Sequence, residues 1–256
     1  MNPAQRPTLP VLPTVAESFS ILANRGAQFA KLALVPVAIT LASQIASGYF
    51  AAVFGAFWLN WAWYLPYVII VTPFAVAWTR LILLPSSGAT VSVVPRFGYR
   101  ELTYLGISIA LAALTGVVPT LTALVLLTSD RIGVAFGPML VLVAVSVVLA
   151  TFVALRLSFA LPAVAIDRFA GLVGAWRQTE GAALRIFAIN FLVLVPILIV
   201  QIGASLLAAL IGTELPALIF RAAIEVVFTF LLVGGVVVAT ALAYQRIVVG
   251  VTAPSY

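Results

Sequence analysis

The chain of 256 residues is 64% hydrophobic and only 8% charged, and its mean hydropathy is +1.24. A soluble domain normally needs roughly a quarter to a third charged residues on its surface. The composition therefore excludes a soluble globular protein. At roughly 20 apolar residues per helical span, the length leaves room for about six spans and no separate soluble domain.

The composition also excludes much catalytic chemistry. There is no Cys and no His, so disulfides, iron–sulfur clusters, His-ligated haem, a His-bearing zinc site and a Ser-His-Asp triad are ruled out. The single lysine, Lys31, leaves little scope for Schiff-base catalysis, and the seven acidic residues are scattered. We therefore expect no enzyme, no metal site, no cofactor and no nucleic-acid partner.

The predicted elements begin after residues 1–13, which contain four prolines and are expected to form an extended cytoplasmic tail. Thr14 and Glu17 have the spacing of a capping box, which predicts an amphipathic helix at the membrane interface. Six apolar stretches long enough to cross a bilayer follow: residues 30–57, 62–84, 101–128, 137–166, 184–212 and 216–249. The predicted fold is all-α, a single six-span membrane domain over residues 14–256.

The charges predict the orientation of these spans. One side of the membrane would hold eleven basic and four acidic residues, a net charge of +7, and the other side two basic and three acidic residues, a net charge of −1. Cytoplasmic loops carry an excess of Lys and Arg. Both termini are therefore expected to be cytoplasmic.

Arginines recur at the ends of the spans. Each pair of spans opens with an arginine and closes with another that is set in an apolar run, at separations of 55, 56 and 61 residues along the chain. The opening residues are Arg25, Arg100 and Arg185, and the closing residues are Arg80, Arg156 and Arg246. This pattern favours three two-span units, residues 14–88, 89–167 and 168–251. The alternative is that any hairpin of this length places arginine at both cytoplasmic ends.

We call these six residues the arginine layer. Because the chain stays apolar beyond each closing arginine, the guanidinium groups must snorkel, pair or bind a phosphate. The four acidic residues on that side are too few to pair eleven bases, and arginine binds phosphate through paired hydrogen bonds. We therefore expect the arginine layer to bind phospholipid headgroups or another membrane protein. The alternative is that these residues only set the topology.

Three other charged residues are expected to form structural ion pairs. Asp167 lies among arginines and is expected to tie the end of the fourth span to the amphipathic segment that holds Arg177. Arg221 and Glu225 are one helical turn apart near the outer end of the last span. Because an acid within a membrane is a candidate for function, Glu225 is also the residue on which proton or ion coupling would be tested.

One segment shows a family pattern. It combines an arginine at the end of a span, a proline in an apolar run, an acidic residue, a glycine-bearing link, and an amphipathic helix with an aromatic residue and a polar cap. These are Arg156, Pro162, Asp167, Gly171, Trp176 and Thr179. The segment resembles the membrane domain of the glycerophosphoryl diester phosphodiesterase membrane-domain and YciC-like families.

The resemblance implies a six-span protein of the bacterial inner membrane. Two departures from the family pattern are visible. Asp167 stands where the pattern has Glu, and the metal-binding acids and the histidine of a phosphodiesterase domain have no counterpart. The resemblance therefore does not imply hydrolase activity.

The leading functional hypothesis is a non-enzymatic scaffold or accessory subunit that binds phospholipid headgroups or another integral membrane protein through the arginine layer. The alternative is a small transporter or permease with kinked helices. A transporter needs polar groups along a path through the membrane, and the candidates are few: Gln44, Asn190, Gln201, Arg221 and Glu225.

Overall fold

The computed structural model describes residues 9–55, 64–84, 97–128, 136–210 and 215–249, and every element within them is a helix. The tail residues 1–8 lie outside the described part. In chain order the helices are α1 (Val11–Asn24), α2 (Gly26–Phe54), α3 (Tyr64–Leu83), α4 (Tyr99–Thr128), α5 (Phe136–Leu157), α6 (Ala160–Ala165), α7 (Gly171–Gln178), α8 (Ala183–Ala209), α9 (Leu215–Tyr244) and the π-helix η5 (Gln245–Val249).

The predicted six-span, all-α fold is confirmed for the described residues. Six segments are long and apolar enough to cross a membrane: Gly26–Phe50, Pro66–Leu83, Tyr99–Thr122, Leu140–Ala165, Ala183–Leu207 and Ile219–Val248. The fourth stretch is divided into α5 and α6 at Ser158 and Phe159. Pro162 explains the division, because a proline ring clashes with the carbonyl of the residue four positions earlier, here Ser158.

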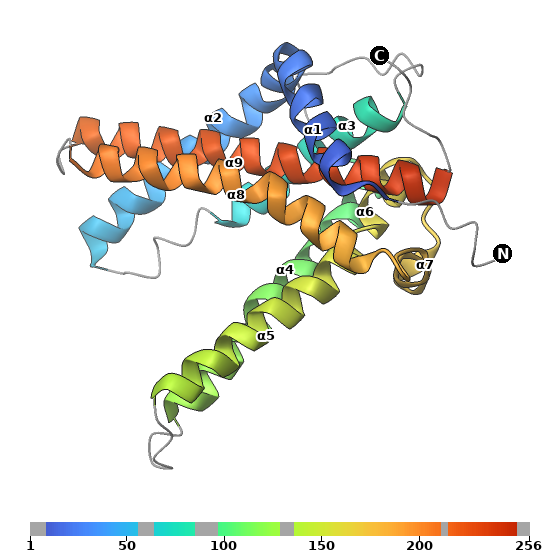
Figure 1. Cartoon of the computed structure of the whole chain (residues 1–256). Helices are drawn as coiled ribbons and strands as arrows, with labels where there is room; N and C mark the ends of the chain where they lie inside the picture. Colours follow the sequence, from blue (N-terminus) through green and yellow to red (C-terminus); the bar gives the residue numbers. More distant parts are fainter. Residues whose placement is uncertain (1–8, 56–63, 85–96, 129–135, 211–214, 250–256) are drawn as a thin grey trace.

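The spans form three antiparallel hairpins, α2/α3, α4/α5 and α8/α9 (Figure 1). Helix α9 is central, because α1, α2, α3 and α8 all pack against it. Of its span, 56% is buried, against 6% for the α4 span. The α4/α5 hairpin diverges from the others and meets them at its base beside α6 (Figure 1). The division into three two-span units with an internal repeat stays a prediction.

Two adjacent glycines let the other helices approach α9. A Cβ atom on Gly234 would lie 2.3 Å from Cε2 of Phe29, a residue of α2. A Cβ atom on Gly235 would lie 3.0 Å from Cγ1 of Val193 on α8. Small residues serve the same purpose at many helix contacts in membranes, because they let the backbones pack closely.

Aromatic side chains fill the contact between α2, α3 and α9. Phe29 packs edge-to-face on Phe74 and on Trp78, with ring centroids 5.5 and 5.3 Å apart, and Phe74 packs in the same way on Phe230 at 5.4 Å. The indole Nε1 of Trp78 donates to the carbonyl of Gly234 at 3.3 Å. Edge-to-face pairs add to the energy of area burial, so this cluster fixes how the first hairpin sits on α9.

The capping box expected at Thr14 is wrong. Helix α1 begins at Val11, within the expected extended tail, and its N-cap residue is Pro10. Thr14 instead lies in the first turn of the helix, where its hydroxyl donates to the Pro10 carbonyl. The helix can begin early because the N–H groups of a first turn have no partner within the helix, so the missing N–H of Pro13 costs nothing there.

The glycine contact gives a test of the packing on α9. We expect Gly234→Ala to lower the stability by about 1–3 kcal/mol, the usual effect of overpacking, because the new methyl group meets the Phe29 ring. The matched control is Gly203→Ala on α8, where a Cβ would meet no atom within 4 Å and where the better helix propensity of alanine should leave the protein equally or more stable. Thermal unfolding in detergent measures both. Equal melting temperatures for the two variants would contradict the close packing.

Candidate functional site

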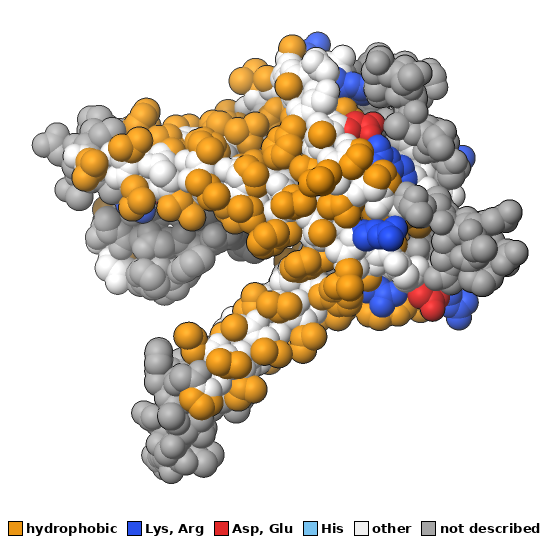
Figure 2. All heavy atoms as spheres, viewed as in Figure 1, with side chains coloured by type: hydrophobic (Ala, Val, Ile, Leu, Met, Phe, Trp, Pro, Cys, Tyr) orange, Lys and Arg blue, Asp and Glu red, His pale blue; other side chains and the backbone are white. Residues whose placement is uncertain are grey.

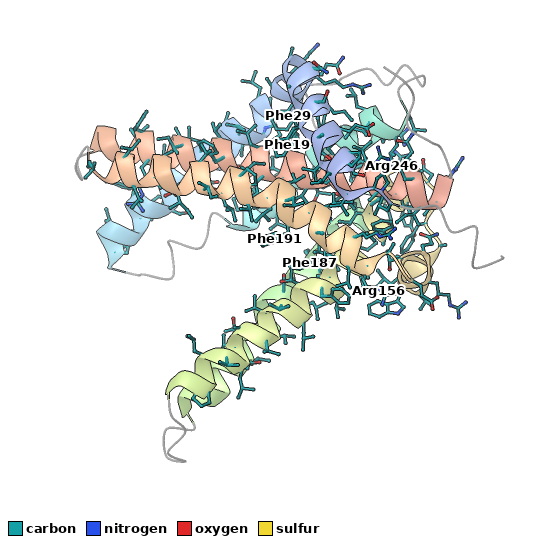
Figure 3. All side chains as sticks on the ribbon, viewed as in Figure 1. Phe19, Phe29, Arg156, Phe187, Phe191 and Arg246 are labelled. Atoms are coloured by element: carbon teal, nitrogen blue, oxygen red, sulfur yellow. The ribbon has the colours of Figure 1, made fainter. Side chains whose placement is uncertain are left out.

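Lys and Arg side chains gather mainly at one end of the molecule, the right of Figure 2, where α1, α6 and α7 lie beside the ends of the spans. The long apolar surfaces of α4, α5, α8 and α9 extend away from this end. We call this end the arginine face. Figure 3 labels Arg156 and Arg246, which come from different hairpins and both lie on this face.

Arg80, in the last turn of α3, caps the short helix α6. Its Nη1 donates to the Ala165 carbonyl at 2.8 Å, one of the last carbonyl groups of α6. Such carbonyls have no donor within their own helix. Nη1 also lies 3.5 Å from Oδ2 of Asp167, which follows α6. The arginine therefore joins the end of the second span to the connection after the fourth span.

Asp167 holds a second arginine. Arg100 at the start of α4 donates from Nε to Oδ1 at 2.9 Å and from Nη2 to Oδ2 at 2.6 Å, a bidentate pair of the kind that arginine forms with carboxylates. The expected link from Asp167 to the segment holding Arg177 is therefore wrong. The ion pairs described for Asp167 run to α3 and α4 instead, because the chain turns sharply before α7 begins.

The backbone conformation at Asp167 orients its carboxylate. Asp167 has a left-handed φ of 61°. Its N–H donates to the carbonyl of Val164 at 3.1 Å, and the next N–H, of Arg168, donates to that of Ala163 at 2.8 Å. These two bonds form a Schellman motif, in which a left-handed residue ends a helix. Asp accepts this conformation more readily than most residues other than glycine. Hydrogen bonding from Arg100 lowers the pKa of the Asp167 carboxyl below its ordinary 3.8.

Arg156, at the end of α5, holds α7. Its Nη2 donates to the Trp176 carbonyl at 2.8 Å and its Nε to the Thr179 hydroxyl at 3.1 Å. Its guanidinium carbon also lies 3.6 Å from the centroid of the Trp176 ring, a cation–π contact. The carbonyl belongs to the last turn of α7, so Arg156 caps α7 as Arg80 caps α6.

Arg246 and Arg25 complete the pattern. Arg246 forms a salt bridge with Glu17 and donates to the hydroxyl of Thr14, so η5 is tied to α1. Arg25, between α1 and α2, donates from Nη1 to the Leu81 carbonyl at 2.8 Å, in the last turn of α3. Arg185 is exposed in the first turn of α8. Five arginines of the described residues thus connect separate elements at the arginine face: Arg25, Arg80, Arg100, Arg156 and Arg246.

These contacts supply protein acceptors that the sequence argument for phosphate binding did not count. That argument held that the acidic side chains are too few to pair the arginines. The sequence argument counted only acidic side chains and assigned Glu17 to a helix start. Glu17 pairs with Arg246, and carbonyls at helix ends accept from Arg25, Arg80 and Arg156. The sequence could have revealed such acceptors, because every predicted helix ends with four carbonyls that lack an internal donor.

Helix α7 and the residues before it form the exposed part of the arginine face. Arg168 and Arg177 are exposed there. Between and beside them lie four exposed apolar side chains, with the most exposed, Val173, at 66%. These are Phe169, Leu172, Val173 and Trp176. A short helix that presents apolar and basic side chains together is typical of an interfacial membrane element.

A separate polar cluster lies at the other end of α9. Arg221 and Glu225 form the expected ion pair, with 3.1 Å between Nε and Oε1. The Gln44 amide of α2 donates to Glu225 at 2.9 Å, a partner that the sequence did not identify. Oγ1 of Thr40 and Oε1 of Gln44 are buried without a hydrogen-bond partner. In the part of the chain that the structure describes, no three acidic side chains gather to hold a metal ion.

The Asp167 contacts predict a pH-dependent stability. We expect Asp167→Asn to lower the melting temperature, because Asn keeps the left-handed turn but loses the charge that faces Arg100 and Arg80. The lowered pKa makes the contribution of Asp167 fully present above pH 3.8, and it disappears as the pH falls further. The difference in melting temperature between wild type and variant should therefore close at acidic pH. A control variant, Arg168→Gln, removes a neighbouring exposed charge and should show no such convergence. A difference that persists unchanged at low pH would contradict the assignment.

Comparisons with protein-family models, with curated proteins and with solved structures find no match to this chain. Its resemblance to the membrane-domain families therefore stays a prediction from the residues of segment 156–185.

Proposed function

We propose that this integral membrane protein is a non-enzymatic scaffold or accessory subunit that binds anionic phospholipid headgroups at the arginine face. We further propose that it resides in the bacterial inner membrane with both termini in the cytoplasm. The observation that carries the proposal is the exposed surface of α7, where basic and apolar side chains lie together. Another integral membrane protein that presents acidic groups is the alternative partner for the same surface.

The arginines of this face divide into two groups under the proposal. Arg80, Arg100 and Arg246 have side chains exposed by 26, 31 and 13%, and their contacts to protein groups assign them to structure. Arg168, Arg177 and Arg185 are exposed and are the residues proposed to meet phosphate. Arg156 belongs to both groups, since its two described hydrogen bonds use two of the five N–H donors of a guanidinium.

The alternative function, a small transporter, draws support from the unpartnered oxygens of Thr40 and Gln44. A transport path would need further polar groups between that cluster and the arginine face. Asn190 donates to the Ile186 carbonyl within its own helix and accepts from Thr240, which assigns it to packing. Glu225 is already matched by Arg221 and Gln44. We therefore favour the scaffold.

The proposal predicts which arginines control lipid retention. We expect the triple variant Arg168→Gln, Arg177→Gln and Arg185→Gln to retain much less phosphatidylglycerol than wild type. Each arginine near an anionic surface contributes about 1 kcal/mol, so losing three should weaken the affinity by about two orders of magnitude. Native mass spectrometry of protein released from detergent, with phosphatidylglycerol added at known concentrations, measures the retention.

The matched control is Arg221→Gln, which removes an exposed arginine at the opposite end of α9. It should retain the lipid as wild type does, as long as its melting temperature shows that the fold persists. Equal retention by the triple variant and by wild type would mean that the exposed arginines only set topology, and the headgroup-binding proposal would have to be abandoned.

A further inference from the structure

An apolar groove lies where α1 crosses α8 and α9. Its walls are Phe19 and Leu22 of α1, Pro196 and Val200 of α8, and Phe228 and Leu231 of α9, and its volume is about 370 Å³. Figure 3 shows Phe19 at this crossing. Every residue that lines the groove is apolar, and α8 and α9 are both membrane spans. The groove therefore opens toward the hydrocarbon of the bilayer.

Helix α1 fixes the level of the groove relative to the headgroups. On its exposed side, the Asn24 amide donates to the Ser20 hydroxyl, and in its middle Glu17 pairs with Arg246 of the arginine face. Its opposite side carries Phe19 and Leu22 into the groove. An amphipathic helix with this division lies at the boundary between headgroups and acyl chains, which places the groove directly beneath the headgroups.

We propose that the groove is a binding site for one acyl chain of a phospholipid in the leaflet next to the arginine face. The proposal deepens the proposed function and rests on it, since the lipid whose headgroup reaches the arginine face would place a chain here. It adds a site for the chain that is independent of the charge of the headgroup.

The chemistry of the groove and its place between two membrane spans favour an acyl chain. An acyl chain is the apolar group that surrounds such spans in a bilayer, and it needs no polar partner, which agrees with the apolar lining. Pro196 contributes to the shape, because a proline inside a helix removes one backbone hydrogen bond and bends the helix.

The experiment uses the full chain in vesicles of phosphatidylcholine that contain a small share of phosphatidylcholine with a photoreactive diazirine in the middle of one acyl chain. After illumination, digestion and mass spectrometry locate the crosslinks. Wild type should be crosslinked at the groove, mainly in residues 19–23, 196–200 and 228–231. Val200→Trp, which fills the groove from α8, should lose most of these crosslinks.

A second variant and a control separate filling of the groove from damage to the fold. Ala23→Phe fills the groove from the α1 side and should lose the same crosslinks. Ile199→Trp adds the same bulk as Val200→Trp one position earlier on α8, at an exposed side chain that does not line the groove, and should be crosslinked as wild type. Melting temperatures close to that of wild type show that all three variants fold.

The experiment tests the acyl-chain site separately from headgroup binding at the arginine face, because phosphatidylcholine carries no net charge to attract the arginines. Loss in Val200→Trp and Ala23→Phe with retention in Ile199→Trp supports the chain site, even if the arginine variants leave headgroup binding unchanged. Three results would overturn the chain site: equal crosslinking in all variants, crosslinks spread evenly over the exposed faces of α4 and α5, or no crosslink at the groove in wild type.

Discussion

The architecture depends on one constraint: buried or half-buried guanidinium groups need acceptors, and the last carbonyls of a helix need donors. The protein meets both needs with the same contacts. Arg25 donates to the end of α3, Arg80 to the end of α6 and Arg156 to the end of α7. The negative end of each helix dipole adds to the attraction. The arginines therefore hold the short helices of the arginine face onto the spans.

Close packing on α9 has a different physical origin. Lipid tails are as apolar as leucine, so burial of apolar area does little to drive helices together within a bilayer. Contact area and shape matter instead, and Gly234 and Gly235 let Phe29 and Val193 approach the α9 backbone. In α4, by contrast, a Cβ atom on Gly106 or Gly116 would meet no atom within 4 Å, in keeping with the low burial of this span. The helices that pack on α9 thus form the most closely packed part of the described structure.

The sequence predicted the helical class, the number of spans and most of their boundaries, because hydropathy alone determines them. It also predicted the Arg221–Glu225 pair, which depends only on spacing along one helix. It failed where the partner lies far along the chain or belongs to the backbone. Asp167 could not be assigned to Arg100, 67 positions away, and Gln44 could not be assigned to Glu225. No pattern in the sequence showed that Arg246 would reach back to α1, more than two hundred residues earlier.

The same limit applies to the functional residues. Position relative to the spans identified arginines as a group, but it could not separate those that hold carbonyls from those that remain exposed on α7. Exposure makes that distinction: it moves the proposed lipid contacts from Arg80 and Arg246 to Arg168 and Arg177, and it keeps Arg185. Both the fold and the proposed function therefore depend on one claim: arginines at the ends of the spans hold α1, α6 and α7 through hydrogen bonds and ion pairs.

Hydrogen exchange of the backbone amides tests most directly whether these arginines hold α7 and α1 in place. In Arg156→Met, exchange should rise in α7 and stay unchanged in α1, and in Arg246→Met it should rise in α1 and stay unchanged in α7. Each variant is thus the control for the other, since both remove one arginine from the end of a span. Exchange that is unchanged in both helices, or that rises equally in both with either variant, would contradict the account.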